Sequence, residues 1–233
     1  MYLKTYGIIL KFSKMSTILK ILHLDEDQLL NYIIKQLNFF IPDQFEIDKS
    51  LLKKNLPLAL NRLHKCINSV KLWNEDKFDY LHSSQYCIFI YFLSNTIWKQ
   101  SGDTILPTKL FVLNKALNGI DLFYEVEMPE HFFIGHSVGI VLAKAKYGDY
   151  LVLYQNSTVG KSRGVSPEIQ NRVIMYPNTA VIGKSIISEG SIISQGTSVI
   201  NQVTQKNKIV YQGADKELVY KIPQGSIIDD FFR

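Results

Sequence analysis

The chain has 233 residues, 46% of them hydrophobic, so it is long enough for one or two domains with a sizeable core. Its net charge of +5 comes from lysines scattered along the sequence. No basic stripe with interleaved aromatic residues is present in the sequence, which argues against a nucleic-acid-binding protein. Cys66 and Cys87 have apolar neighbours and no metal-ligand spacing, so we expect buried free thiols and a cytoplasmic location.

The N-terminal half reads as helical. No signal-peptide pattern precedes it, and we expect residues 1–15 to form a poorly ordered extension, with Met15 as an alternative start. Residues 16–118 carry apolar side chains at helical spacing and predict an all-helical domain. Asp25 is the expected N-cap of the first long helix. The prolines that punctuate the domain are Pro42, Pro57 and Pro107.

The last two stretches of this domain carry further signals. Residues 81–98 form the longest uncharged run, about as long as a membrane span requires. Because Gln85 and Asn95 lie within it, we expect a buried helix and no stable membrane insertion. A further helix is expected over residues 108–117, since Asn118 and Gly119 form a helix-ending signal.

Aliphatic residues recur at a step of six over residues 119–203, which is neither the helical nor the strand period. Small residues stand beside them, where tight corners need small side chains. A short period of this kind predicts stacked coils that bury a continuous core. The predicted fold class is therefore α+β, an all-helical N-terminal domain followed by a left-handed parallel β-helix of hexapeptide repeats. The longest unbroken series of anchors is Ile169, Met175, Val181, Ile187, Ile193 and Val199.

One longer loop, residues 161–167, interrupts the repeat, and loops of this kind commonly carry function. The coils are expected to end near Gln202. Residues 204–233 are then a C-terminal tail with a strand-like stretch, residues 208–212, and a second apolar stretch, residues 218–222.

Asp121 and His136 are a candidate catalytic pair. His136 follows a corner of a coil and Asp121 stands fifteen positions earlier, a spacing that lets neighbouring coils bring the two side chains together. A carboxylate that orients an imidazole makes it a competent general base. On spacing alone an alternative stays open, in which Asp121 caps a turn and His136 is merely exposed.

The residues around this pair resemble the serine acetyltransferase family. Residues 135–141, Gly-His-Ser-Val-Gly-Ile-Val, are similar to the family's Asp-His-Ala-Thr-Gly-Ile-Val. Residues 154–160, Tyr-Gln-Asn-Ser-Thr-Val-Gly, are similar to its Leu-Gln-x-Val-Thr-Leu-Gly. The family's spacing from Asp to the catalytic His matches Asp121 and His136, and residues 167–169 match the end of its long loop. The resemblance covers about residues 80–215.

This resemblance implies acetyl-CoA as the co-substrate, no metal, and direct transfer without a covalent enzyme intermediate. It also implies a homotrimer with active sites between subunits, or a dimer of such trimers through the helical domain. Basic residues that suit the cofactor phosphates are Lys161, Arg163, Lys184 and Lys206. Positions expected to hold the rest of the cofactor are Thr158, Gly160, Lys161, Tyr176, Pro177 and Gln195. The acceptor is expected beside Gly135, Tyr154 and Ser166.

The acceptor positions depart from the family's pattern. Gly135 replaces an acidic residue that contacts the amino group of serine, and Val165 with Ser166 replaces an Arg-His pair that holds its carboxylate. The sequence therefore predicts an O-acetyltransferase acting on a sugar or a cell-surface polysaccharide precursor. Alternatives are a serine O-acetyltransferase with charges supplied from elsewhere, N-acetylation of an amino sugar, and a non-catalytic β-helix subunit that assembles or binds.

Overall fold

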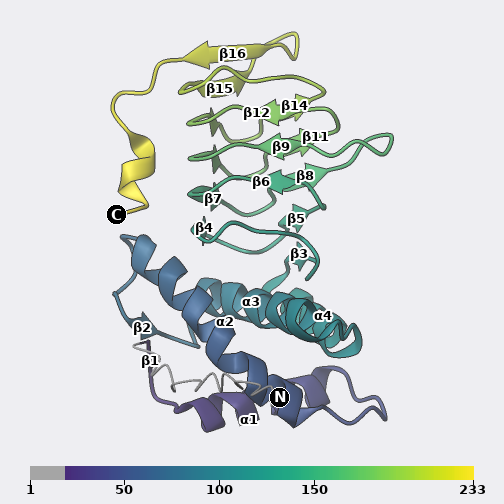
Figure 1. Ribbon diagram of the computed structural model, residues 1–233. Helices are drawn as coiled ribbons and strands as arrows, with labels where there is room; N and C mark the ends of the chain where they lie inside the picture. Colours follow the sequence, from purple (N-terminus) through teal and green to yellow (C-terminus); the bar gives the residue numbers. More distant parts are fainter. Residues whose placement is uncertain (1–18) are drawn as a thin grey trace, which may run out of the picture.

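The computed structural model describes residues 19–233, so the expected extension over residues 1–15 and the alternative start at Met15 lie outside it. Helices come first and a stack of short strands follows (Figure 1). A small parallel sheet, β1 (Lys20–Ile21) with β2 (Lys77–Phe78), joins the start of the described chain to the segment between the second and third helices. The helices are α1 (Glu26–Phe40), α2 (Lys49–Ser69), α3 (Ser83–Ser101) and α4 (Ile105–Asn118).

The helix ends follow the expected capping signals. The carboxylate of Asp25 accepts a hydrogen bond from the Gln28 backbone N–H, and the Gln28 side chain accepts one from the Asp25 N–H. This capping box confirms Asp25 as the N-cap of α1. At the other end of the domain, Gly119 adopts a left-handed φ of 64° and ends α4. Glycine takes this conformation without a side-chain penalty, which confirms the predicted stop.

Two prolines lie inside helices rather than between them. Pro107 stands in the first turn of α4, where its missing N–H removes no helical hydrogen bond, so the helix begins at Ile105 rather than at Thr108. Pro57 lies within α2, and the helix continues through it. Because proline has no N–H, the carbonyl of Lys53, an exposed residue, loses its helical hydrogen-bond donor.

Helix α3 crosses the centre of the helical domain, and all its residues from Ser84 to Ile97 are buried. This confirms the buried helix expected over residues 81–98. Among residues 19–233, none of the helices combines the length and the apolar character of a membrane-spanning segment. Cys66 and Cys87 are free thiols in the core, and burial raises the pKa of each to about 12.

The strands form the left-handed parallel β-helix that the six-residue period predicts. Three flat sheets enclose one interior (Figure 1). The largest sheet contains β4 (Phe132–Ile134), β7 (Leu151–Leu153), β10 (Ile174–Met175), β13 (Ile192–Ile193), β15 (Ile209–Gln212) and β16 (Leu218–Lys221). The second contains β3 (Asp121–Leu122), β5 (Val141–Leu142), β8 (Thr158–Gly160), β11 (Ala180–Ile182) and β14 (Ser198–Ile200). The third contains β6 (Lys146–Tyr147), β9 (Glu168–Ile169) and β12 (Ile186–Ile187).

The predicted anchors stack in register, one column on each sheet. Met175 aligns with Leu153 and Ile193 on the largest sheet. Val181 and Ile187 hold the same place on the other two sheets, and the side chains of Met175, Val181 and Ile187 are fully buried. Each step of six residues therefore moves the chain from one sheet to the next.

The stack extends beyond the expected end near Gln202. Strand β15 pairs in parallel with β13, so it adds another layer to the β-helix. Strand β16 then folds back antiparallel on β15. Strand β16 covers the edge of β15, which would otherwise present unpaired backbone groups, and becomes the last strand of the largest sheet.

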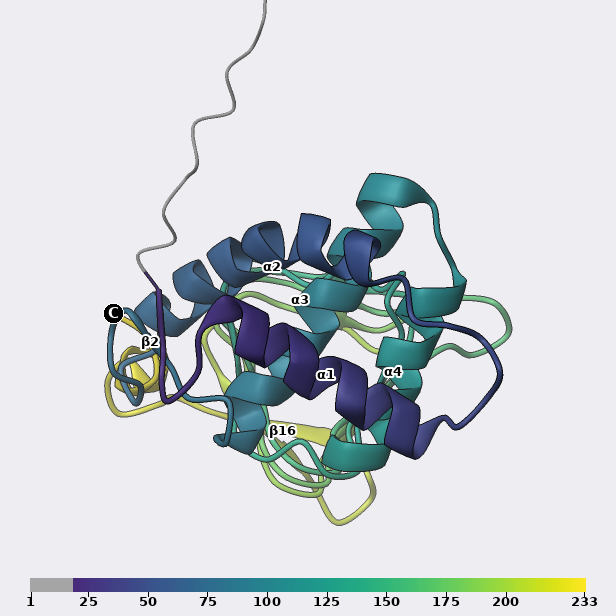
Figure 2. The ribbon, with the colours of Figure 1, turned by 90° about the horizontal axis from the view of Figure 1, so that it is seen from below.

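The C-terminal tail returns along the outside of the β-helix to the helical domain (Figures 1 and 2). A short 3-10 helix, η1 (Ile227–Asp230), precedes Phe231 and Phe232, and both of these side chains are buried. The backbone of Phe232 bridges to Val70 just after α2. The guanidinium of Arg233 donates to the carbonyl oxygens of Asn68 and Trp73 at 2.9 Å each. The tail thus ties the upper coils to the end of α2.

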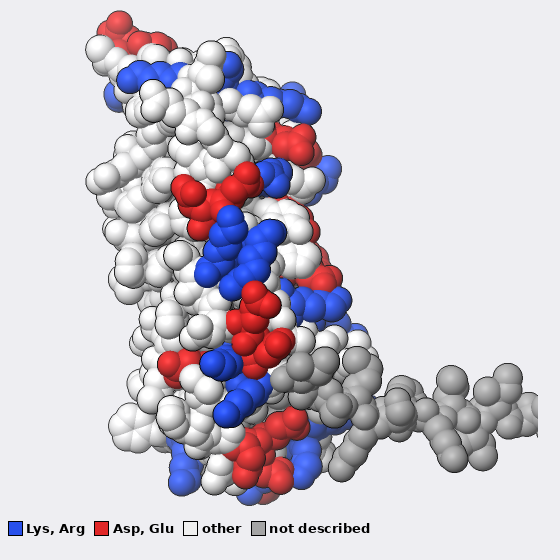
Figure 3. Space-filling model, turned by 90° about the vertical axis from the view of Figure 1, so that its left-hand side faces the viewer, with Lys and Arg blue, Asp and Glu red and all other residues white. Residues whose placement is uncertain are grey.

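The helical domain and the β-helix share one core. The hydroxyl of Tyr91 on α3 donates to the Val126 carbonyl at 2.6 Å, and the Asn95 amide donates to the Tyr124 carbonyl at 2.7 Å. On the face shown in Figure 3, acidic and basic side chains alternate along the molecule beside a surface that carries few charges. This face therefore carries no extended basic stripe of the kind that binds nucleic acid.

Candidate functional site

His136 lies in the turn after β4, and its side chain is exposed. Neither ring nitrogen has a hydrogen-bond partner among residues 19–233. The neighbouring aromatic ring is that of Tyr154, with ring centroids 6.4 Å apart and an angle of 56° between the planes. The imidazole is therefore free to accept a proton from a molecule that approaches from solvent.

Asp121 begins the first coil, where its backbone N–H donates to the Ile140 carbonyl at 2.8 Å. Its carboxylate binds Lys115 of α4, with Nζ 2.6 Å from Oδ2. In the described chain this carboxylate makes no hydrogen bond to His136. The sequence pattern missed Lys115 because it belongs to the helical domain rather than to the repeat. The catalytic pairing of Asp121 with His136 stays a prediction.

Gly135 and Tyr154, both expected at the acceptor site, are in direct contact. A Cβ built on Gly135 would lie 2.5 Å from Cε1 and 2.7 Å from Cδ1 of the Tyr154 ring. Tyr154 in turn stacks on Tyr176 of the next coil, with centroids 5.6 Å apart and planes 19° apart. Burial raises the pKa of both tyrosines, so both rings stay neutral at physiological pH.

A second imidazole and carboxylate form a pair that spacing did not predict. His131 Nδ1 lies 2.8 Å from Asp149 Oδ2, and the His131 backbone N–H donates to Asp149 Oδ1 at 2.9 Å. The ring of Tyr150 stacks on the imidazole at 5.0 Å, and Phe232 of the tail packs against Tyr150. This pair lies at the opposite end of β4 from His136, and its side chains are 24% and 36% exposed. Its geometry favours a structural role.

Two hollows open on the face of the third sheet. One, of about 480 Å³, lies at the base of the loop over residues 161–167 and includes Ser166 and Lys184. Lys144 and Lys146 also line it, so it is rich in basic side chains, although Lys144 pairs with Glu125 and Lys146 with Glu168. Lys146, Lys184 and Ser166 come from three different coils, so only the stacking of the coils brings them together.

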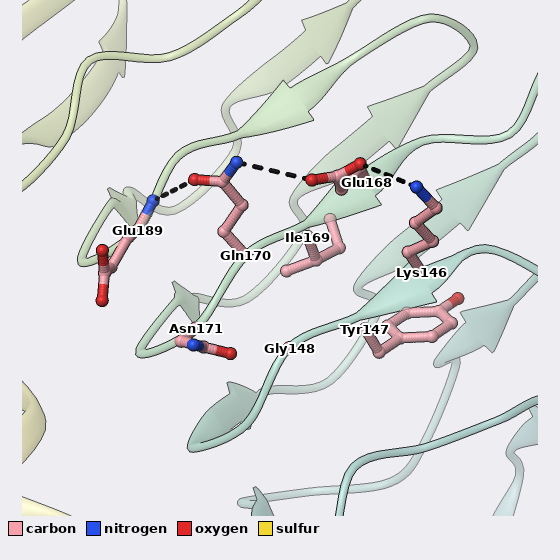
Figure 4. A pocket seen from close by; sticks show the side chains of 8 residues that line it. All are labelled: Lys146, Tyr147, Gly148, Glu168, Ile169, Gln170, Asn171 and Glu189. Atoms are coloured by element: carbon pink, nitrogen blue, oxygen red, sulfur yellow. Dashed lines mark hydrogen bonds and ion pairs between the residues drawn. The ribbon is translucent and has the colours of Figure 1, made fainter.

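The other hollow, of about 360 Å³, is drawn in Figure 4. Its polar groups bind one another. Lys146 Nζ lies 3.3 Å from Glu168, the Gln170 amide donates to Glu168 at 3.4 Å, and the Glu189 N–H donates to Gln170 at 3.1 Å. These contacts join three neighbouring coils across the hollow. Within residues 19–233 no group of three or more His, Cys, Asp or Glu side chains is placed to hold a metal ion.

Comparison with known proteins gives one consistent result. The serine acetyltransferase of Synechococcus elongatus is 27% identical over 122 residues, which cover 50% of this chain and 49% of that protein. The serine acetyltransferase of Bacillus subtilis is 22% identical over 134 residues, which cover 55% of this chain and 61% of that protein. The match therefore spans only about half of the length of these curated relatives. No protein-family model matches the chain.

Solved structures agree on the fold. Serine acetyltransferase from Vibrio cholerae O1 biovar El Tor N16961 superposes with a TM-score of 0.66 at 17% identity, over 88% of this chain and 83% of that chain. A serine acetyltransferase in complex with CoA gives a TM-score of 0.65 at 13% identity, over 84% and 86%. This chain is serine acetyltransferase-like. Soybean serine acetyltransferase complexed with serine gives a TM-score of 0.61 at 16% identity, over 82% and 84%.

In this serine acetyltransferase-like chain the expected cofactor residues fall into two groups. Tyr176, Pro177 and Gln195 lie at successive corners that lead into the second sheet, on the same side as His136. Gly160 and Lys161 lie at the far end of that sheet, where the loop leaves β8 and leads to the expected acceptor residue Ser166. Thr158 stands between them at the start of β8. The width of the second sheet separates the two groups within one chain.

Proposed function

We propose that this chain is an acetyltransferase that moves an acetyl group from acetyl-CoA to an acceptor hydroxyl. The observation that carries the proposal is the exposed imidazole of His136, without a protein partner in the described chain, on a fold that matches serine acetyltransferases. The CoA complex of a structural neighbour supports acetyl-CoA as the co-substrate. The unpaired thiols of Cys66 and Cys87 support a cytoplasmic location.

In the proposed reaction His136 takes the proton from the acceptor hydroxyl as its oxygen attacks the thioester carbon. The tetrahedral intermediate carries an oxyanion that needs preorganised donors, and backbone N–H groups near Gly160 or Lys161 of a neighbouring copy are the candidates. Collapse of the intermediate expels the CoA thiolate, which takes the proton back from the imidazolium. We propose that Asp121 orients the imidazole when its carboxylate is released from Lys115.

We propose L-serine as the first acceptor to test, because both curated relatives are serine acetyltransferases. The sequence alone favoured a sugar, and the comparisons give that preference no support. For serine to bind, charges must come from residues other than those at positions 135, 165 and 166, since a zwitterion needs an opposite charge at each end.

An uncharged hydroxyl, such as that of a sugar, is the second candidate. The observation that favours it is the contact between Gly135 and Tyr154, which leaves no space for an acidic side chain next to His136. Val165 and Ser166 add no charge from the loop.

We further propose that the active sites form between the β-helices of a homotrimer. The support is the separation of the predicted cofactor residues, because Tyr176 and Lys161 lie at opposite ends of the second sheet within one chain. A neighbouring copy that places its loop beside the His136 corner would complete one site. Mass measurement in solution tests the trimer and the dimer of trimers.

Thiol release from acetyl-CoA tests the function, with L-serine in one reaction and a panel of free and nucleotide-linked sugars in others. Release with serine supports the serine acetyltransferase reading. Release with a sugar and not with serine supports the uncharged acceptor. No release with any acceptor, when acetyl-CoA binds, would count against the enzyme and favour the non-catalytic alternative.

A further inference from the structure

The imidazole of His136 lacks the usual means of orientation. A general base of this kind works best when a second group holds its ring in one position. In the described chain neither nitrogen has a hydrogen-bond partner, and the carboxylate of Asp121 is bound to Lys115. The contact that remains is with the ring of Tyr154.

The same tyrosine also sets the course of the backbone that carries His136. The Tyr154 ring lies so close to Gly135 that even a methyl group at that position would clash with it. The Gly135 N–H donates to the Leu153 carbonyl at 2.9 Å, and its own carbonyl accepts from the Ser84 hydroxyl at 3.2 Å. Gly135 is therefore held between strand β7, helix α3 and the aromatic ring, one residue before the imidazole.

Tyr154 is itself held by three other aromatic rings. Tyr176 stacks on it from the next coil, as described above. Phe133 packs edge-on at 6.4 Å, and Phe231 of the C-terminal tail packs edge-on at 6.3 Å. Edge-on and offset contacts are the favoured arrangements of aromatic pairs, so the ring has a defined position. Because the Tyr154 ring is fixed on three sides, it can hold the Gly135 backbone and the His136 imidazole in defined positions.

We propose that Tyr154 is the positioning residue for His136: its ring, seated on Gly135, fixes the corner of the coil and the placement of the imidazole. The proposal goes beyond the acetyltransferase function and holds for either acceptor. It rests on that function only for its kinetic test. An error of about 1 Å in the placement of a catalytic group costs up to about a hundredfold in rate, so the effect is measurable.

The kinetic test compares Tyr154→Leu with Tyr211→Leu. Tyr211 occupies the equivalent register position higher in the same sheet, within strand β15, so it controls for loss of a tyrosine ring from this sheet. Tyr154→Leu is expected to lower kcat by about tenfold or more, with the KM for acetyl-CoA unchanged. Tyr154→Phe, which keeps the ring, is expected to recover most of the loss.

A second pair of variants tests the contact between the Tyr154 ring and Gly135. Gly135→Ala alone is expected to lower kcat because its methyl group clashes with Tyr154. In the Tyr154→Leu background the same change is expected to cost much less, because the clash is gone. Such non-additivity between two substitutions is the signature of direct coupling.

A direct readout does not depend on turnover. The His136 ring protons, assigned with His136→Asn, are expected to lose a ring-current shift in Tyr154→Leu and to keep it in Tyr211→Leu. Circular dichroism and the melting temperature establish that each variant is folded. If the wild-type protein transfers no acetyl group, the proposed function fails while this measurement still tests the contact. Unchanged His136 signals in folded Tyr154→Leu, or an unchanged kcat, overturn the proposal.

Discussion

The amine of Lys115 lies 2.6 Å from the carboxylate of Asp121, where the last turn of α4 meets the first coil. This ion pair occupies the carboxylate that the sequence assigns to His136. The Lys115 side chain is 56% exposed, so the pair is screened by solvent and is weak. A weak competitor can be displaced when a substrate enters.

Lys115→Met is expected to raise kcat, because it frees Asp121 for His136. Exposed ion pairs contribute up to about 1 kcal/mol, so the increase in kcat is at most about fivefold.

Asp121→Asn is expected to lower kcat strongly and to leave the KM for acetyl-CoA almost unchanged. Steady-state kinetics of the two variants and their double mutant measure this. If Asp121→Asn turns over normally, the residue serves only as an ion-pair partner of the helical domain.

His136→Asn is expected to abolish transfer, because asparagine cannot take up the proton of the acceptor hydroxyl. The matched control is His23→Asn, since His23 is exposed, lies in the helical domain, and has a left-handed φ of 65° that asparagine tolerates. Thiol release from acetyl-CoA is the measurement. Near-normal release by folded His136→Asn would remove the imidazole from the mechanism.

Phe232→Ala is expected to lower the free energy of unfolding by about 3 kcal/mol, the usual cost of removing a buried phenylalanine ring. Phe232 is 5% exposed and packs on Tyr150, whereas Phe39 on α1 is 78% exposed. Phe39→Ala is therefore the control and is expected to change stability by less than about 0.5 kcal/mol. Urea titrations measure both, and equal midpoints would mean that the tail contributes nothing to stability.

Alkaline pH is expected to destabilise the protein through its two thiols. Burial raises the pKa of Cys66 and Cys87 from 9.0 to about 12, above the value in the unfolded chain. The unfolded state therefore loses these protons first as the pH rises. The contribution of the two protonated thiols to folding stability is complete below pH 9. It is lost as the pH rises toward 12, at about 1.4 kcal/mol per pH unit for each thiol.

Urea midpoints between pH 8 and pH 11 measure this slope. In the double variant Cys66→Ala, Cys87→Ala, the loss of stability per pH unit is expected to be smaller. Buried tyrosines such as Tyr91 account for part of the pH dependence that this variant keeps. The native thiols are also expected to resist thiol reagents until the protein unfolds, because the thiolate is the reactive form. An identical slope in the double variant would exclude the thiols as its cause.

Local patterns predicted most of the fold. The six-residue period predicted the β-helix because each anchor faces the same interior whatever the rest of the chain does. The Asp25 cap and the Gly119 stop act within a few residues of their own position. Pro57 was misread because α2 continues through it, with Leu56 and Ala59 buried on either side, although a proline costs the helix one hydrogen bond.

The candidate site was less predictable, because its decisive contacts join distant segments. Nothing in the repeat indicates that Lys115 binds Asp121, or that Asp149 binds His131. The resemblance directed attention to Gly135, and only the structure showed that the Tyr154 ring fills the space beside it. At the candidate site, tertiary packing brings together side chains from separate coils and helices. A linear sequence motif does not encode such contacts.

The tail contact has a consequence for the order of folding. Residues 227–233 bind the end of α2, more than 150 positions earlier, so this contact closes a very long loop of chain. Loop closure of that length is slow and follows the stacking of the coils in between. On a ribosome the helical domain and most coils would emerge and pack before the partner of Val70 had been synthesised. The contact between residues 227–233 and the end of α2 is therefore expected to form last, after the helical domain and the β-helix have folded.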